Sequence, residues 1–358
     1  MNAQARDPAG PGRAGRSPDD VPVTAAACTL SGALAVATAA GTIPTVFATG
    51  ILRGPAVMNG SVRGTALVML AAGLPVLITS MLAARRGAAR AVLLWLGSAA
   101  YLAYNAVLLL FATPFNHLFL LYVAILSLSV WSVAAVLHSI DIEAFGRRFG
   151  PGLPARGIAV YVGTVVAVNT AFWLRAVVPG MLASGTPAFL KGTGLTTFPT
   201  YVQDLSFWLP LTAVAACWLW QRAAWGFVIV GSMLIYSVLE SVTIAADQAL
   251  GHAADPASAL ASGTIAPVFV VLAVIGMIPA AIFLRHLDRI PPAGSGADHA
   301  EKDQPRQASP PPAATRPPAK GARSHETRAY RLRLEAAKET GRVRHERTSA
   351  RTCQRSPG

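Results

Sequence analysis

The sequence predicts an all-α fold, a polytopic bundle of eight transmembrane helices. Its 358 residues are 53% hydrophobic and only 13% charged, and the mean hydropathy is +0.47. Soluble domains carry about 25% charged residues, so this composition argues against a soluble fold. Eight stretches also approach the roughly 20 apolar residues that a helix needs to cross a hydrocarbon core of about 30 Å.

The predicted spans are residues 25–48, 65–83, 88–111, 118–137, 158–182, 205–220, 223–246 and 265–284. The sixth is short, but Trp218, Trp220 and Trp225 flank Arg222 as an interfacial aromatic belt would. The first has two interpretations, a retained span or a cleaved signal peptide, because an Arg-containing leader precedes an Ala-rich segment. Acidic residues offset the arginines of that leader and the segment is long for a signal peptide, which favours a retained span.

Arginine and lysine in the connections predict the orientation, because positive residues resist translocation. One side carries only Arg53, Arg63 and Lys191. The other side carries ten arginines before the C-terminal segment is counted, namely Arg6, Arg13, Arg16, Arg85, Arg86, Arg90, Arg147, Arg148, Arg156 and Arg222. We therefore expect both termini on the cytoplasmic side of a bacterial plasma membrane. The net charge of +13 is explained by this retention and predicts no nucleic-acid partner.

Both ends of the chain differ in composition from its apolar middle. Residues 1–24 are expected to form a disordered cytoplasmic leader, residues 25–290 the membrane domain and residues 291–358 a disordered basic tail. The stretch 291–318 is rich in Pro, Ala, Gly and charge, so it cannot bury enough apolar surface to offset the entropy of ordering. A solvated tail is the simpler interpretation, and binding to anionic lipid headgroups is the alternative. The lipid bilayer itself is the predicted partner.

An internal repeat is predicted at an offset of 135 residues, which aligns the first three spans with the fifth to seventh without a gap. Pro44 then falls on Pro179, Leu74-Pro75 on Leu209-Pro210, Tyr101 on Tyr236 and Asn105 on Glu240. Identity is low, 11 of 64 positions from Pro44 to Val107, but the matches cluster at prolines and at equal membrane depths. Four spans separate the copies, so they would share one orientation in a parallel 4+4 repeat.

No enzyme motif is present. The sequence lacks a zinc-protease His-Glu-x-x-His, a phosphate-binding Gly-rich loop with Lys, a Gly-x-Ser-x-Gly elbow and a Cys-x-x-Cys pair. All seven histidines lie at span ends or beyond, which argues against a haem bundle. His252 and Asp255 are a weak candidate for an external metal ion. The sequence therefore predicts no catalytic residue, no metal site and no cofactor.

The candidate site consists of ionisable and polar groups in or beside the spans, because a charge at mid-helix costs about 2.5–3.5 kcal/mol. Arg175 and Glu240 each lie 17 residues from the start of their spans, so we expect them at one depth, on facing helices and close enough to pair directly or through Asp204 or a water. Asn105 has the same depth, and Asp204 and Asp247 lie at span edges. Either these charges snorkel or form a packing pair, or they line an outward-open vestibule for a small solute, a lipid headgroup or an ion.

The runs Tyr104-Asn105, Phe115-Asn116-His117 and Asp204-Leu205 resemble those of a group of bacterial multi-span membrane proteins that has no assigned activity. The resemblance covers the eight spans and neither terminus. It implies that Tyr104, Asn105, Asn116 and Asp204 are recurring positions. The group has several arginines where this chain has only Gln221-Arg222, which weakens the predicted inner boundary there.

Three function classes follow from these observations: a small-solute or ion transporter, a non-catalytic scaffold or sensor acting through the basic tail, and an intramembrane enzyme. The absence of a nucleophile and of a metal motif places the enzyme last. The transporter would use the polar positions in the outer half of the bundle.

Overall fold

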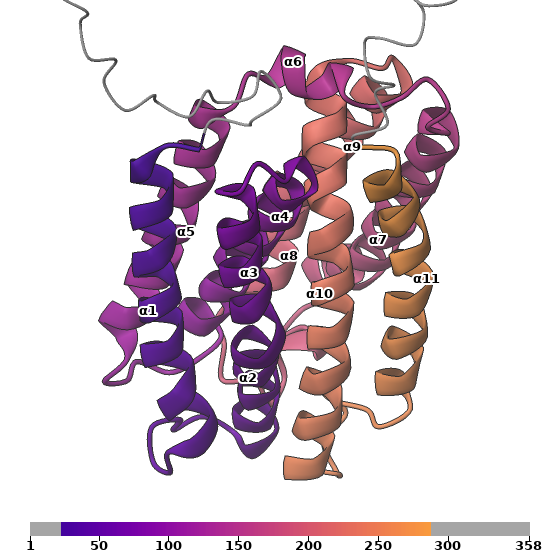
Figure 1. Cartoon of the computed structure of the whole chain (residues 1–358). Coiled ribbons are helices and arrows are strands. Elements are labelled where there is room, and N and C mark those ends of the chain that lie inside the picture. The colour runs from indigo at the N-terminus through magenta and orange to yellow at the C-terminus, as the bar shows by residue number, and fades with distance from the viewer. Residues whose placement is uncertain (1–22, 288–358) are drawn as a thin grey trace, which may run out of the picture. The chain divides into compact units, whose positions relative to one another are not determined.

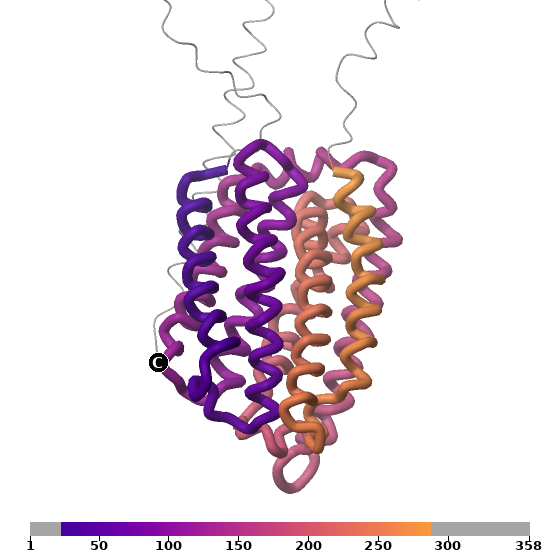
Figure 2. Tube along the Cα trace, turned by 60° about the horizontal axis from the view of Figure 1, so that its bottom comes forward, coloured from indigo at the N-terminus to yellow at the C-terminus, as the bar shows by residue number. Residues whose placement is uncertain are grey.

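The computed structural model describes residues 23–287, and these residues are almost entirely helical (Figure 1). The predicted tail, and the predicted leader up to residue 22, lie outside the described residues. Within the described part, eight helices are long and apolar enough to cross a membrane, as predicted: Ala25–Phe47, Ala56–Ala84, Ala89–Phe111, Phe119–Ser139, Ala155–Leu182, Pro199–Trp220, Ala224–Ala254 and Ile265–Arg285. Helix α1 (Ala25–Phe47) begins, and helix α11 (Ile265–Arg285) ends, at the same end of the bundle (Figure 2).

The second span begins nine residues earlier than predicted. It consists of α2 (Ala56–Val68), the π-helical turn η1 (Met69–Gly73) and α3 (Leu74–Ala84). Pro55 precedes its first turn, and the Asn59 side chain closes the entering loop by bonding the backbone of Gly54 at 2.8 and 3.1 Å. Arg63, which the sequence placed in an outer connection, therefore lies inside this helix.

The sixth and seventh spans are also longer than their hydropathy predicts. The sixth consists of α8 (Pro199–Gln203), the π-helical turn η3 (Asp204–Trp208) and α9 (Leu209–Trp220). The seventh, α10 (Ala224–Ala254), continues eight residues past the predicted end. Hydropathy falls at a charged residue, whereas a helix continues as long as its backbone bonds are made. Asp204 and Asp247 consequently lie within spans and not at their edges.

Helix boundaries repeat at the predicted offset of 135 residues. Both π-turns obey it, and in each a backbone N–H bonds the carbonyl five residues earlier, Leu74 to Met69 and Leu209 to Asp204. Pro75 and Pro210 directly follow the two donor residues. A π-turn before a proline relieves the clash of the proline ring with the preceding helical turn. Helices α1 and α7 (Ala155–Leu182) likewise end with a capping bond, from Ala48 to Pro44 and from Ala183 to Pro179.

The fourth and eighth spans complete the repeat at a larger offset of 146 residues, since α5 (Phe119–Ser139) and α11 both contain 21 residues. The parallel 4+4 organisation therefore holds for the secondary structure. The two most buried spans are equivalent by the repeat: α4 (Ala89–Phe111) and α10, which pack against each other. Figure 1 shows α10 in the middle of the bundle, with α2 and α3 on one side and α11 on the other.

Helix α2 packs tightly on α10 through two glycines. A Cβ added at Gly60 would lie 2.3 Å from the Leu250 carbonyl oxygen, and one at Gly64 would lie 2.5 Å from that of Ala246. Small residues four apart let helix backbones approach closely inside a membrane. The positions equivalent to these glycines by the repeat are Leu195 and Pro199, so the second repeat has no such contact surface.

Candidate functional site

Glu240 lies at the centre of a polar cluster in the bundle interior. Its side chain is 8% exposed, and its carboxylate accepts a hydrogen bond of 2.8 Å from the Asn105 amide on α4. The same amide nitrogen donates to the Tyr101 carbonyl at 3.1 Å, which orients the side chain. The Asn105 amide oxygen is buried and has no partner among the described residues. Two positions equivalent by the repeat thus face each other across the central helix pair.

The direct ion pair expected between Arg175 and Glu240 is not formed among residues 23–287. Arg175 is exposed on α7, a helix that packs mainly against α9, and among residues 23–287 the hydrogen-bond partner of the Glu240 carboxylate is Asn105. Equal depth does not place two side chains on facing surfaces, because the rotation of each helix about its axis decides where a side chain points. Arg175 therefore does not belong to the polar cluster.

Asp204 supplies a second buried carboxylate, 7% exposed, at the start of η3. The indole N–H of Trp173 on α7 donates to its Oδ2 at 2.8 Å. The hydroxyl of Tyr104 lies close to this carboxyl group.

An aromatic group covers the cluster on the side of the sixth span. The rings of Trp208 and Tyr236 are stacked, with centroids 5.3 Å apart and planes 5° apart. Tyr104 meets both edge-on, at 5.8 and 5.4 Å. Aromatic pairs of this geometry add to the stability of the packing beyond the area that they bury. One helical turn before Asn105 on α4, the Tyr101 hydroxyl forms a hydrogen bond of 2.7 Å with the Thr243 hydroxyl on α10.

The other two predicted site residues, Asp247 and Asn116, make no hydrogen bond to this cluster among the described residues. Asp247 is half-buried two turns further along α10 and lines a cavity of about 110 Å³ together with Ser61 and Thr200. Asn116 is buried in the loop before α5, where its side chain bonds the Leu118 N–H at 2.9 Å and the Pro114 carbonyl at 3.1 Å. An Asn side chain that bonds the backbone two residues away forms an Asx-turn, so these contacts give Asn116 a role in folding the loop.

Sequence reasoning missed three contributors to the site. Trp173 and Trp208 are ordinary apolar span residues by hydropathy, and only their contacts place them beside Asp204 and Tyr236. Gln203 is 8% exposed, and neither polar atom of its amide makes a hydrogen bond among the described residues. Gln203 is a polar residue directly before Asp204, and the sequence is largely apolar from residue 205 onward. This pair of polar residues at the start of an apolar stretch could have identified Gln203 from the sequence.

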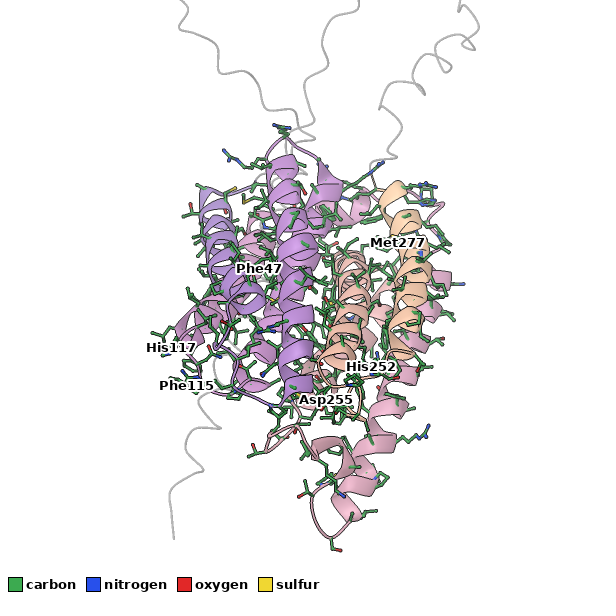
Figure 3. All side chains as sticks on the ribbon, turned by 90° about the horizontal axis from the view of Figure 1, so that it is seen from below. Phe47, Phe115, His117, His252, Asp255 and Met277 are labelled. Carbon is green, nitrogen blue, oxygen red and sulfur yellow. The ribbon has the colours of Figure 1, made fainter. Side chains whose placement is uncertain are left out.

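Metal-binding groups are not assembled in the described part of the chain. No three His, Cys, Asp or Glu side chains between residues 23 and 287 are close enough to hold a metal ion. His252 and Asp255 lie at the end of α10, away from Phe115 and His117 at the left edge of Figure 3. The His252 ring packs against Gly263, and its Nδ1 is buried with no partner in the described part of the chain.

No family model, curated protein or solved structure matches this chain. The resemblance to a bacterial membrane protein group therefore stays a prediction. What the described residues establish is an architecture, eight apolar helices around a buried polar centre. By that architecture the chain is a multi-pass integral membrane protein.

Proposed function

We propose that this protein is a transporter whose binding centre holds a small cation, a proton or a metal cation such as Na⁺, at the carboxylates of Glu240 and Asp204. One observation carries the proposal. The Glu240 carboxylate is buried among membrane-spanning helices, and among residues 23–287 it is paired with a neutral amide and with no Lys or Arg. Removing a carboxylate from water costs several kcal/mol unless a positive charge compensates it. A bound cation supplies that charge.

The surrounding groups suit such a ligand. Asp204 brings a second acidic group, and the Asn105 amide oxygen is a buried acceptor without a partner between residues 23 and 287. Carboxylate and amide oxygens are the ligands that hard cations prefer in proteins. Asp204 also opens a π-turn, and interrupted helices beside a central site are a recurrent feature of transporters, where unwound backbone contributes to ion binding.

The experiment measures ion flux into vesicles. The full-length protein is reconstituted into liposomes that contain either a pH-sensitive or a Na⁺-sensitive dye, and inward gradients of H⁺, Na⁺ or K⁺ are imposed. We expect a protein-dependent flux that falls at least about tenfold in Glu240→Gln, which keeps the side-chain shape and removes the charge. The matched control is Glu143→Gln, on the exposed surface of α6 (Ile142–Arg147), which should leave the flux unchanged.

Equal flux through wild-type and Glu240→Gln vesicles would show that Glu240 does not bind the transported cation. Vesicles that contain the folded protein and show no more flux of H⁺, Na⁺ or K⁺ than empty vesicles would overturn the transport proposal itself.

A further inference from the structure

We propose that the cavity beside Asp247 binds a hydrated monovalent metal cation and forms the outer entrance to the cation centre at Glu240. This inference rests on the proposed transport function and deepens it by adding a second cation site on the outer side. The cavity has a volume of about 110 Å³. One water takes up about 30 Å³ in the liquid, so the cavity has room for a small cation with part of its water shell.

The wall of the cavity carries oxygen-bearing side chains from three spans. They are Asp247 and Gln248 on α10, Ser61 and Thr65 on α2, and Thr200 on α8. Carboxylate, amide and hydroxyl oxygens are the ligands that hard cations prefer in proteins. None of the described residues that line the cavity is a Lys or an Arg. The lining therefore favours a cation over an anion.

The Asp247 carboxylate is open to such a ligand. Its side chain is half-buried, and its oxygens are not among the buried side-chain atoms without a partner in the described part of the chain. Only neutral side chains, those of Ser61 and Gln248, lie close to the carboxyl group, and no Lys or Arg between residues 23 and 287 forms an ion pair with it. A carboxylate inside a helix bundle is costly without a compensating charge, and one monovalent cation balances it.

The repeat places this cavity near the axis that relates its two copies. Thr65 and Thr200 are equivalent at the offset of 135 residues, and both line the cavity. Ala112 and Asp247 are equivalent in the same way, and they also line it. Residues that a rotation relates come together only near the rotation axis. In a parallel repeat this axis runs along the membrane normal, which is the direction of transport.

The Asn105–Glu240 pair lies near the same axis, deeper in the membrane. These two residues are also equivalent by the repeat, and they meet at 2.8 Å. Asp247 follows Glu240 by seven residues on α10, which is two turns or about 10 Å further toward the predicted outer end on one helix face. Thr243 lies between them on this face, and its hydroxyl forms the bond to Tyr101. The cavity and the pair are therefore successive sites with one packed layer between them.

Two sites in series suit the transport of an ion. The charge of the outer carboxylate raises the local concentration of cations at the entrance. Conduction also requires that each site bind a cation strongly enough for it to enter and weakly enough for it to leave, which several successive sites achieve. Asp247 would thus supply cations to Glu240.

The test measures how fast a cysteine in the cavity wall is labelled from outside. In the full-length protein with its three native cysteines replaced by serine, Thr200→Cys is treated in intact cells with two membrane-impermeant methanethiosulfonates, one trimethylammonium and one sulfonate. We expect the positive reagent to react faster, and Asp247→Asn to reduce the ratio of the two rates by about tenfold. Na⁺ or K⁺ should slow labelling by the positive reagent, compared with N-methylglucamine at equal ionic strength.

Two matched controls accompany this measurement. Asp255→Asn removes a carboxylate at the end of the same helix and should leave the ratio at Thr200→Cys unchanged (Figure 3). Ser184→Cys, exposed in the loop after α7, should give a ratio that does not respond to Asp247→Asn. The proposal is overturned if Thr200→Cys is not labelled, if its ratio is the same with Asp and Asn at position 247, or if neither cation slows the reaction.

Ion flux in liposomes separates this inference from the transport proposal. Asp247→Asn should raise the half-saturating concentration of the transported cation several-fold, whereas Asp255→Asn should not change it. Cation-sensitive labelling that depends on Asp247, without any flux, would leave the cation site standing and the transport proposal overturned. Flux that requires Glu240 but keeps its half-saturating concentration in Asp247→Asn would leave transport standing and remove Asp247 from the pathway.

Discussion

Asn105 and Glu240 show how single side chains are placed in this bundle. Each is polar in an apolar helix, each has the same number of residues between it and the start of its span, and the repeat makes them equivalent. Because α4 and α10 pack against each other, the two side chains meet at 2.8 Å. Arg175 was predicted at the same depth but lies on the exposed surface of α7, so predicted depth alone did not identify the partner of Glu240.

At this scale we predict that Asn105 and Glu240 are energetically coupled. Asn105→Leu removes the donor to a buried carboxylate and should cost about 1–3 kcal/mol of stability. Glu240→Leu strands the Asn105 amide in the same way, whereas the double variant leaves neither group unpaired. The double variant should therefore lose less than the sum of the single losses, by about 0.5–3 kcal/mol, in unfolding followed in detergent.

The control for this cycle is Arg175→Gln. Its side chain is exposed on α7 and makes no bond to either residue among those described, so whatever the change does to stability should not depend on the residue at position 240. Strictly additive losses for Asn105 and Glu240 would contradict the coupling.

Helix α2 illustrates what decides packing at the level of elements. Gly60 and Gly64 are four residues apart and lie against the carbonyl groups of α10, closer than any side chain would allow. Sequence analysis did not single them out, because two glycines in a stretch of low hydropathy look like part of a loop. Their role depends on which helix lies opposite them.

We expect Gly64→Ala to separate α2 from α10. The added Cβ would meet the Ala246 carbonyl at 2.5 Å, and such overpacking against backbone typically costs about 1–3 kcal/mol or more. The matched control is Gly32→Ala in α1, where an added Cβ has no heavy atom within 4 Å. That change should be neutral or stabilise the helix by about 0.5–1 kcal/mol. Unfolding midpoints of both variants provide the measurement, and equal effects at the two positions would refute the packing argument.

For the molecule as a whole, the even number of spans places the start of α1 and the end of α11 at one end of the bundle (Figure 2). The arginine distribution predicts that this end faces the cytoplasm. Arg147 and Arg86 lie at this end by the order of the spans, and the loop containing Lys191 lies at the other.

The orientation is tested by cysteine labelling in intact cells. In a background with Cys28, Cys217 and Cys353 replaced by Ser, Lys191→Cys should react with a membrane-impermeant maleimide, whereas Arg147→Cys should react only after the membrane is permeabilised. Both positions have exposed side chains, so a difference reports sidedness and not burial. Labelling of the residue at 147 in intact cells, with protection at 191, would invert the predicted topology.

From composition, hydropathy and the positions of prolines one obtains the helical class, the number of spans and the period of the repeat, because these depend on local quantities such as transfer free energy and backbone geometry. Only the packed structure showed that Asn105, and not Arg175, is the hydrogen-bond partner of Glu240 among the described residues. It also showed that the sixth and seventh spans include Asp204 and Asp247. The cavity that Thr65, Thr200 and Asp247 line together is likewise visible only in the packed structure. Those features depend on the rotation of each helix about its axis and on which helix lies opposite, and these follow from the packing of all the helices together.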